Sequence, residues 1–170
     1  RLLEDCPLFN AGHGAVFTSA GTHELDAAIM DGATLRSGAI ANVNCVRNPV
    51  FAARAVMETS KHVFFVGEGA EAFAKDAGLE LVDPSYFSTE ARREQLLRVQ
   101  RETPEAAVLD HDGQAMVARG QPAPADPLDS DKKFGTVGAV ALDAQGNLAA
   151  ATSTGGITNK QVGRVGDAPL

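Results

Sequence analysis

The part of the sequence with the clearest potential for chemistry begins at Gly135–Thr136. A threonine hydroxyl can act as a nucleophile when a base activates it. Here the threonine lies between a proline-containing segment and an apolar run that is expected to form a buried strand. Because β-branched residues favour strand starts, strand propensity alone favours a structural role for Thr136.

Further polar residues follow in the same part of the chain. Arg164 and Asp167 stand three residues apart in a glycine-punctuated segment, a spacing that by itself is typical of a solvated surface pair. Thr154 precedes two glycines, where a hydroxyl most often closes a strand end or a turn. Residue by residue, a structural role remains the simpler interpretation of each of these side chains.

The elements that must position these residues can be placed from local patterns. Asn48–Pro49 is typical of a helix start with Asn48 as N-cap, and apolar residues at helical spacing predict a helix over 49–59. Strands are expected over 24–32, 37–43 and 62–66, a second helix should open at Gly67, and a charged surface helix is expected over 89–102 with Leu96, Leu97 and Val99 on its inner side.

The last third of the chain predicts a linker followed by a hairpin. Residues from about 102 to 135 are rich in proline and charge and have little apolar surface to bury, which indicates a mobile linker. After it, strands over 136–143 and 148–154 flank a turn at 144–147. Both strands are so poor in polar residues that burial on both faces is expected.

Composition excludes several classes of protein. The chain has 170 residues, 44% hydrophobic and 22% charged, with a formal net charge of -7, as in one ordinary soluble domain. No run approaches the ~20 apolar residues of a membrane span, and no signal segment opens the sequence. The 15 Lys and Arg residues are scattered among 22 Asp and Glu residues, which argues against a nucleic-acid partner. Cys6 and Cys45 lack metal-ligand spacing and are too few for a disulfide scaffold, so a cytoplasmic setting is expected.

Six blocks of sequence, in chain order, match the pattern of one known family. They are LLEDCPLFNAGHGAVF (2–17), ELDAAIMDG (24–32), RNPVFAAR (47–54), GTVGAVALD (135–143), GNLAAATSTGGITNK (146–160) and GRVGDAPL (163–170). In these blocks the chain resembles the plant-type asparaginase and isoaspartyl aminopeptidase family of N-terminal nucleophile (Ntn) hydrolases. The resemblance implies an α/β fold of the four-layer αββα sandwich type, present here as a fragment truncated at both ends.

The resemblance also implies roles for the residues introduced above. A precursor of this family cuts itself between the positions of Gly135 and Thr136, so residues 1–135 would be the C-terminal part of an α subunit and 136–170 the start of a β subunit. The freed Thr136 would supply the nucleophilic hydroxyl and, through its α-amino group, the base. Thr154 would orient that hydroxyl, and Asn10 is a candidate polar group near it.

Substrate recognition and activity follow from the same resemblance. Arg164 is assigned to the α-carboxylate and Asp167 to the α-ammonium of a free amino-acid head group. The implied reaction is hydrolysis of L-asparagine and of β-aspartyl (isoaspartyl) dipeptides through a β-aspartyl-enzyme ester, by α and β subunits that pair as a dimer of heterodimers. The oxyanion-hole donors are expected in a later threonine-glycine segment outside this sequence.

The resemblance implies a cation site as well. The loop from Leu3 to His13 would wrap a monovalent cation, usually sodium, with backbone carbonyl groups. The positions concerned are Leu3, Glu4, Cys6, Phe9, Ala11 and His13. A site made of carbonyl groups leaves little side-chain signature, so this prediction rests on the resemblance alone.

Other interpretations were weighed against this one. A glycosylasparaginase-like amidase, or an inactive fragment that only pairs with other subunits, remains as an alternative. Gly67-x-Gly69-x-x-Ala72 mimics a dinucleotide-binding fingerprint but lacks a repeated βαβ context. Cys6 and Cys45 are expected to be small buried residues. The four histidines have no metal-ligand spacing and are expected at the surface or at strand ends: His13, His23, His62 and His111.

Overall fold

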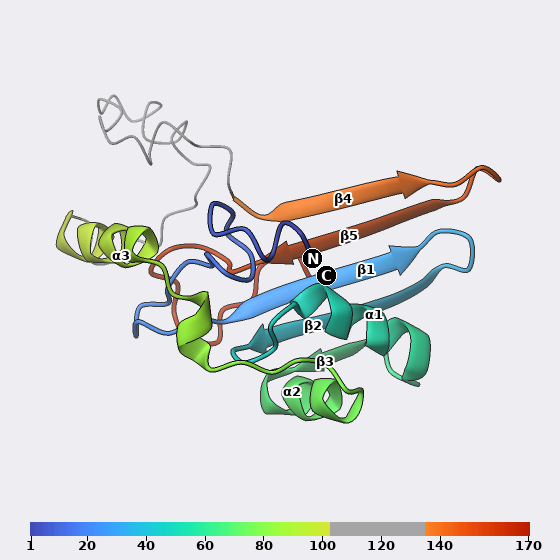
Figure 1. The fold of residues 1–170 in the computed structure, drawn as a ribbon, viewed down its shortest axis with the longest axis horizontal. Helices are drawn as coiled ribbons and strands as arrows, with labels where there is room; N and C mark the ends of the chain where they lie inside the picture. Colours follow the sequence, from blue (N-terminus) through green and yellow to red (C-terminus); the bar gives the residue numbers. More distant parts are fainter. Residues whose placement is uncertain (103–134) are drawn as a thin grey trace.

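The computed structural model describes residues 1–102 and 135–170, which form one five-stranded sheet with accompanying helices (Figure 1). The strands are β1 (Leu25–Asp31), β2 (Arg36–Val43), β3 (Phe64–Val66), β4 (Val137–Leu142) and β5 (Leu148–Thr154). Their order across the sheet is β3-β2-β1-β5-β4. Strand β3 runs parallel to β2, and the other neighbouring pairs are antiparallel. The late strand β5 therefore lies beside the first strand of the chain.

The hairpin of β4 and β5 is confirmed where the sequence predicted it. Gly146 in its turn has a φ of 86°, a left-handed conformation that favours glycine. The Asp143 carboxylate accepts hydrogen bonds from the amides of Gln145 and Asn147, each at 2.8 Å. This local turn chemistry explains why a short-range pattern was enough to place the hairpin.

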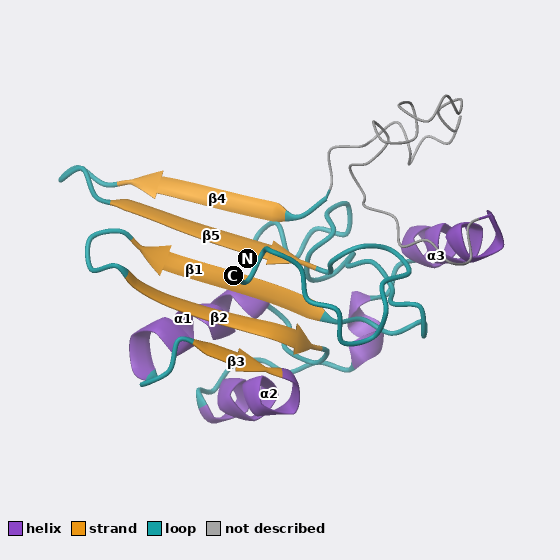
Figure 2. Ribbon diagram, turned by 180° about the vertical axis from the view of Figure 1, so that it is seen from behind, coloured by secondary structure: helices purple, strands orange, loops and turns teal. Residues whose placement is uncertain are grey.

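Helix α1 (Pro49–Thr59) packs on β1 and β2 and covers one face of the sheet (Figure 2). It begins at the predicted residue, with Asn48 at the N-cap position. The Asn48 side chain makes no cap hydrogen bond and donates instead to Asp5 Oδ1 at 3.1 Å. A Cβ atom at Gly38 would collide with the Ala53 carbonyl oxygen, so the glycine in β2 allows the helix to approach closely.

The hydrophobic core fills the space between the sheet, α1 and α2 (Gly67–Asp76). Its larger fully buried side chains are Leu25, Ile40, Val43, Val46, Val56 and Phe87. Helix α2 follows β3 directly, as predicted, and packs against β2, β3 and α1. Strand β3 is shorter than the expected 62–66, because it pairs with β2 only from Phe64 to Val66.

Helix α3 (Glu90–Glu102) follows a 3-10 turn (Pro84–Phe87) and lies beyond the end of the sheet (Figure 1). Leu96 and Val99 are buried as predicted, but Leu97 is 51% exposed, so the expected inner position of Leu97 is wrong. Residues 96 and 97 are neighbours in sequence and point in different directions from a helix, and α3 buries only a narrow stripe. None of the helices in the described ranges has the length and apolar character needed to cross a membrane.

The expectations for one histidine and for the two cysteines need correction. His23 lies two residues before β1, close to the expected strand end, but it is not at the surface: it is only 3% exposed, because its ring packs beside those of Phe17 and Phe87. Cys6 and Cys45 were expected to be buried, yet each is partly exposed, and both are free thiols.

The face of the sheet opposite α1 is open, most of all across β4 and β5. Val140, Leu142 and Leu148 point to this face and are 85%, 68% and 60% exposed. The prediction that both strands are buried on both faces is therefore wrong for the described chain: β4 is an edge strand, and in the described ranges no helix covers it. Residues 168–170 lie against this face farther along, where they border a cavity of about 400 Å³.

The predicted α/β class is confirmed. One sheet and the helices on one of its faces correspond to two layers of the expected αββα sandwich. Residues 1–102 and 135–170 contain no second sheet, so the four-layer arrangement stays a prediction. Residues 103–134, which carry most of the expected linker and His111, lie outside the described residues.

Candidate active site

The hairpin brings the two candidate threonines together. The register of β4 and β5 pairs Val137 with Ser153, so Thr136 and Thr154 lie side by side at the end of the hairpin away from its turn. Thr136 Oγ1 donates a hydrogen bond to Thr154 Oγ1 at 2.9 Å. Thr136 is exposed whereas Thr154 is buried, so the outer threonine is accessible to solvent and the inner hydroxyl holds it by this hydrogen bond.

Thr154 is in turn held by the glycine segment that follows it. The Gly156 amide donates to Thr154 Oγ1 at 3.0 Å. The fully buried Asn10 donates through Nδ2 to the Gly156 carbonyl oxygen at 2.7 Å and accepts from the Val16 amide through Oδ1 at 3.0 Å. A Cβ atom at Gly155 would lie 2.6 Å from Asn10 Oδ1, so the chain must pass close to Asn10 here.

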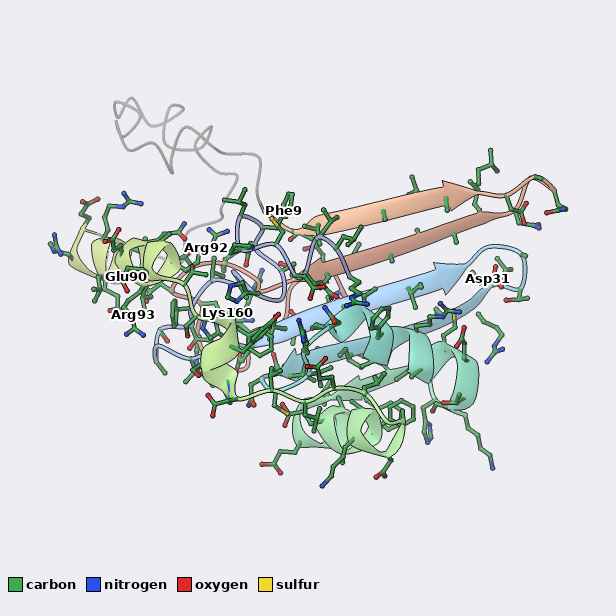
Figure 3. All side chains as sticks on the ribbon, in the orientation of Figure 1. Phe9, Asp31, Glu90, Arg92, Arg93 and Lys160 are labelled. Atoms are coloured by element: carbon green, nitrogen blue, oxygen red, sulfur yellow. The ribbon has the colours of Figure 1, made fainter. Side chains whose placement is uncertain are left out.

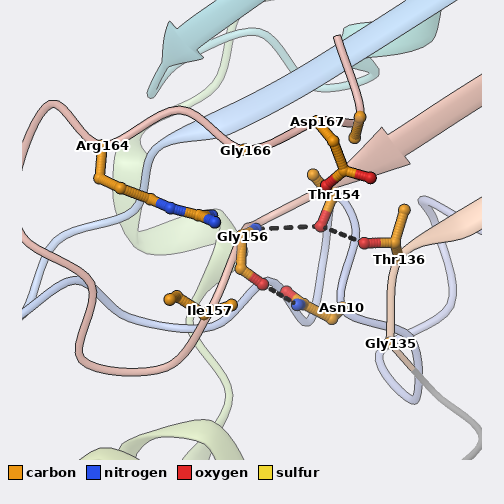
Figure 4. Close-up of a pocket in the computed structure, with 10 residues that line it drawn as sticks. Asn10, Gly135, Thr136, Thr154, Gly156, Ile157, Arg164, Gly166 and Asp167 are labelled. Atoms are coloured by element: carbon orange, nitrogen blue, oxygen red, sulfur yellow. Dashed lines mark hydrogen bonds between the residues drawn. The ribbon is translucent and has the colours of Figure 1, made fainter. Parts of the chain in front are cut away.

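These residues line a small pocket together with the predicted substrate-binding pair. The pocket has a cavity volume of about 50 Å³, and the residues that line it are Asn10, Gly135, Thr136, Thr154, Gly156, Ile157, Arg164, Gly166, Asp167 and Ala168. Arg164 reaches into it from the side opposite Thr136, and Asp167 lies near Thr154 (Figure 4). Five residues selected from the sequence, far apart along the chain, therefore meet at one place: Asn10, Thr136, Thr154, Arg164 and Asp167.

The predicted cation loop forms a series of turns at the edge of this pocket, which it reaches through Asn10. Among the predicted positions, the Glu4 carbonyl oxygen accepts from the His13 amide at 2.7 Å, and the Cys6 carbonyl oxygen accepts from the Phe9 amide at 3.3 Å. Gly12 and Gly14, with φ values of 53° and 126°, let this backbone fold closely on itself. In the described part of the chain, no group of three or more His, Cys, Asp and Glu residues could hold a metal ion.

The Glu4 side chain has a separate role that the sequence did not suggest. It is 1% exposed, and its Oε1 accepts from Ser153 Oγ at 2.7 Å and from the Val50 amide at 2.9 Å. Burial raises the pKa of this carboxyl group above its ordinary value. Glu4 thus ties the loop both to the first turn of α1 and to the strand residue next to Thr154.

A second group of buried charges lies behind the pocket, and sequence reasoning missed it as well. Lys160 and Asp26 are both fully buried, and burial lowers the pKa of the Lys160 ammonium and raises the pKa of the Asp26 carboxyl. Lys160 is the last residue of one of the six blocks, but nothing in the sequence distinguishes a buried lysine from the exposed lysines that are the rule.

The arrangement has clear chemical capacities. An exposed hydroxyl with a fixed hydrogen-bond partner can attack a carbonyl carbon once a base accepts its proton. A guanidinium and a carboxylate in the same small pocket can bind the carboxylate and ammonium groups of an amino acid. Thr152, the other threonine of this strand, donates instead to the Ala168 carbonyl oxygen at 2.6 Å, consistent with a structural role.

Comparison with known proteins agrees with the resemblance seen in the sequence. The isoaspartyl peptidases of Escherichia coli K12 and Salmonella typhimurium are 61% and 62% identical over 170 residues, which is 100% of this chain and 49% and 50% of those proteins. The mouse isoaspartyl peptidase/L-asparaginase is 46% identical over 168 residues, 99% of this chain and 45% of that protein. The chain thus spans about half the length of the curated relatives it matches. The asparaginase family model matches residues 1–170, and the protein therefore belongs to this family of N-terminal nucleophile hydrolases.

Proposed function

We propose that the protein is a self-processing threonine amidohydrolase that cleaves L-asparagine and β-aspartyl dipeptides at the side-chain carbonyl group. One observation carries this proposal: Thr136 Oγ1 lies 2.9 Å from Thr154 Oγ1 in a pocket that also holds Arg164 and Asp167. The family membership and the isoaspartyl peptidase activity named for the relatives support it.

Self-processing would begin at Gly135–Thr136. Thr136 Oγ1 attacks the Gly135 carbonyl carbon, and the C–N bond breaks as the Thr136 nitrogen takes up a proton in exchange for the one lost by the hydroxyl. Water then hydrolyses the resulting ester to give a Gly135 carboxylate and a free Thr136 hydroxyl and amino group. Glycine before the bond tolerates the distorted backbone that this attack requires. The products would be an α subunit ending at residue 135 and a β subunit beginning at Thr136.

Substrate hydrolysis would use the new N-terminus. The Thr136 α-amino group, with a reference pKa of about 7.7–8.0, takes the hydroxyl proton directly or through a water molecule as Oγ1 adds to the side-chain carbonyl carbon. The leaving nitrogen departs with that proton, as ammonia from asparagine or as the amine of the next residue from a β-aspartyl dipeptide. Water hydrolyses the β-aspartyl ester and releases aspartate.

Recognition of the head group would direct the reaction to the side chain. Arg164 would hold the α-carboxylate in a two-point hydrogen bond, and Asp167 would hold the α-ammonium group. With the α-carboxylate held by Arg164 across the pocket from Thr136 and the α-ammonium group held by Asp167, the side-chain carbonyl would be the part of the substrate left to reach Thr136 Oγ1. The glycosylasparaginase-like alternative would need a glycan-bearing substrate, and no observation on the pocket favours one.

We also propose that the loop from Leu3 to His13 binds sodium or a similar monovalent cation through its carbonyl oxygens. A carbonyl oxygen that accepts one hydrogen bond still has a second lone pair, so the Glu4 and Cys6 carbonyls remain possible ligands. Neutral oxygen donors suit a hard cation and not a soft one. Replacing NaCl by choline chloride at equal ionic strength should lower the melting temperature of the protein; an unchanged melting temperature would contradict the site.

The open face of the sheet is where the rest of the expected sandwich would pack. Val140, Leu142 and Leu148 form an exposed apolar surface there. We propose that a second sheet, contributed by sequence outside the described residues, covers it, and that two such αβ pairs assemble into a heterotetramer. Size-exclusion chromatography with light scattering on the full-length protein tests the assembly, and a single αβ pair in solution would refute it.

The function is tested on the full-length protein through Thr136. After incubation, N-terminal sequencing should find a new chain that begins Thr136-Val137, and Thr136→Ala should reduce both self-cleavage and release of ammonia from asparagine by at least about 1000-fold. Thr136→Ser keeps the hydroxyl and should retain cleavage. Thr59→Ala is a matched control, because Thr59 lies at the exposed end of α1.

Two results would contradict the proposal. An intact wild-type chain after long incubation would refute self-processing and would favour the alternative of an inactive, subunit-pairing fragment. Ammonia release by Thr136→Ala at the wild-type rate would refute the assignment of the nucleophile.

A further inference from the structure

Lys160 is a fully buried lysine directly behind the candidate active site. Its side chain is 0% exposed, and Nζ donates to the Glu24 carbonyl oxygen at 2.9 Å and lies 3.7 Å from Glu24 Oε2. Figure 3 shows Lys160 near the start of β1, just after Glu24. Lysine is almost never fully buried unless it is paired, and Glu24, whose side chain is 12% exposed, supplies the opposite charge.

The Lys160 side chain backs one wall of the pocket. A Cβ atom at Gly156 would lie 2.9 Å from Lys160 Cδ and 3.0 Å from Nζ. Gly156 lines the pocket and donates its amide hydrogen to Thr154 Oγ1. The ammonium group therefore lies close to Gly156, which lines the pocket, although Lys160 does not line the pocket itself.

Glu24 connects this lysine to the segment that carries Arg164. Both carboxylate oxygens of Glu24 accept from the Gly163 amide, each at 3.0 Å. Gly163 immediately precedes Arg164, whose own amide closes a turn on the Gln161 carbonyl oxygen at 3.1 Å. The Glu24 carboxylate is thus bound on one side to the turn that begins the arginine segment and on the other side to the buried lysine.

We propose that the Glu24–Lys160 ion pair positions Arg164 for the substrate α-carboxylate. Glu24 and Lys160 are positioning residues here, because neither touches the pocket; the inference rests on the function proposed above. The fully buried Asp26 completes the group, since its carboxylate and the Arg164 guanidinium act electrostatically on Lys160 with opposite signs. Two cations and two carboxylates are thus gathered behind and beside the pocket.

The physical reason for an effect on binding is geometric. A guanidinium binds a carboxylate best through two parallel hydrogen bonds, which require a fixed orientation. Removing the Glu24 carboxylate frees the Gly163 amide and removes the ion-pair partner of Lys160, so that Asp26 is left as the carboxylate acting on the Lys160 charge. The start of the arginine segment then has fewer restraints, and a displacement of about 1 Å can change rates by up to about 100-fold.

The experiment compares substrate kinetics with self-cleavage in variants of Glu24 in the full-length protein. Glu24→Ala should raise the KM for asparagine or a β-aspartyl dipeptide by about tenfold or more and change kcat by less than about threefold. Glu24→Gln keeps one oxygen acceptor for the Gly163 amide and should recover part of the loss in KM. Self-cleavage should stay within about twofold of wild type, because the precursor presents no free α-carboxylate to Arg164. Glu68→Ala, at an exposed position on α2, is the matched control and should match wild type.

Hydrogen exchange separates this inference from the proposed function. In Glu24→Ala, amides of residues 161–167 should exchange at least about tenfold faster, while those of α1 should be unchanged, and Lys160→Met should show the same pattern. If the wild-type protein hydrolyses neither substrate, the proposed function fails, and exchange in residues 161–167 still decides whether the ion pair fixes this segment. Three results for Glu24→Ala would each overturn the inference: a slowing of self-cleavage as large as the rise in KM, an unchanged KM, or unchanged hydrogen exchange in residues 161–167.

Discussion

His23 provides a test of the packing around the start of the sheet. It is 3% exposed, its Nδ1 lies 3.2 Å from the Val16 carbonyl oxygen, and its Nε2 lies 3.0 Å from Ser88 Oγ. A neutral imidazole satisfies both contacts, donating from Nδ1 and accepting at Nε2. Burial, with a smaller contribution from the nearby Arg93 charge, lowers the pKa of His23 from 6.5 to about 4.

The sign of the resulting pH dependence follows from proton uptake. In the unfolded chain His23 becomes protonated as the pH falls through 6.5, whereas in the folded chain it stays neutral until the pH approaches 4. The stability that this histidine contributes is therefore complete above pH 6.5 and is lost as the pH falls. The difference between the two states amounts to about 2 kcal/mol at pH 5 and about 3 kcal/mol at pH 4 and below.

The assay compares wild type with His23→Gln, which does not titrate. The free energy of unfolding in urea is measured for both proteins at pH 7.5, 6 and 5. The advantage of wild type over the variant should shrink by about 2 kcal/mol between pH 7.5 and pH 5. Burial raises the pKa values of Glu4 and Asp26, which opposes this trend, but both carboxyl groups are present in both proteins and cancel in the difference.

The protonation state of His23 can also be measured directly. NMR of the folded wild-type protein should find the His23 ring still largely neutral at pH 5. A ring that titrates near pH 6.5, or a stability difference that is flat with pH, would refute the reasoning, because it would mean that water reaches the imidazole in the folded state.

Two further predictions concern close approaches of the backbone and the pocket wall. Gly38→Ala should lower the free energy of unfolding by about 1–3 kcal/mol, because the new Cβ atom collides with α1. Gly69→Ala, in open space on α2, should raise it by about 0.5–1 kcal/mol. Thermal unfolding measures both variants, and equal effects would contradict the packing of α1 on β2. Asn10→Ala should lower the free energy of unfolding by about 2–4 kcal/mol and slow hydrolysis by Thr136, since the variant leaves the Gly156 carbonyl and the Val16 amide without their partner. If the variant is destabilised but its turnover of substrate is unchanged, Asn10 contributes to folding only.

Elements with strong local signals could be predicted from the sequence. Asn48 marked the start of α1, and the glycine turn marked the hairpin, because each depends on a few neighbouring residues. Once the hairpin is placed, its register brings Thr136 and Thr154 together without further information. Their chemical roles could not be inferred this way, since strand propensity explains a threonine at either position equally well.

The burial of some side chains could not be predicted, because it depends on contacts between distant parts of the chain. The apolar strands of the hairpin suggested burial on both faces, yet Val140 is 85% exposed. Lysines are usually exposed, yet Lys160 is fully buried, since a glutamate 136 residues earlier supplies its partner. Residue type sets the free energy of transfer from water, but only the tertiary arrangement decides which surfaces are covered.

The same long-range contacts explain how the proposed cut could leave the site intact. Cleavage at Gly135–Thr136 would separate residues 136–170 from the rest of the chain covalently, but this segment supplies two of the five strands, and β5 pairs with β1 from Thr154 to Ala149. Across the same boundary, Ser153 Oγ donates to Glu4, and Asn10 donates to the Gly156 carbonyl oxygen. None of these contacts involves the bond that would break. We therefore expect the cut to free the Thr136 amino group, which the chemistry requires as a base, while the walls of the pocket stay in place.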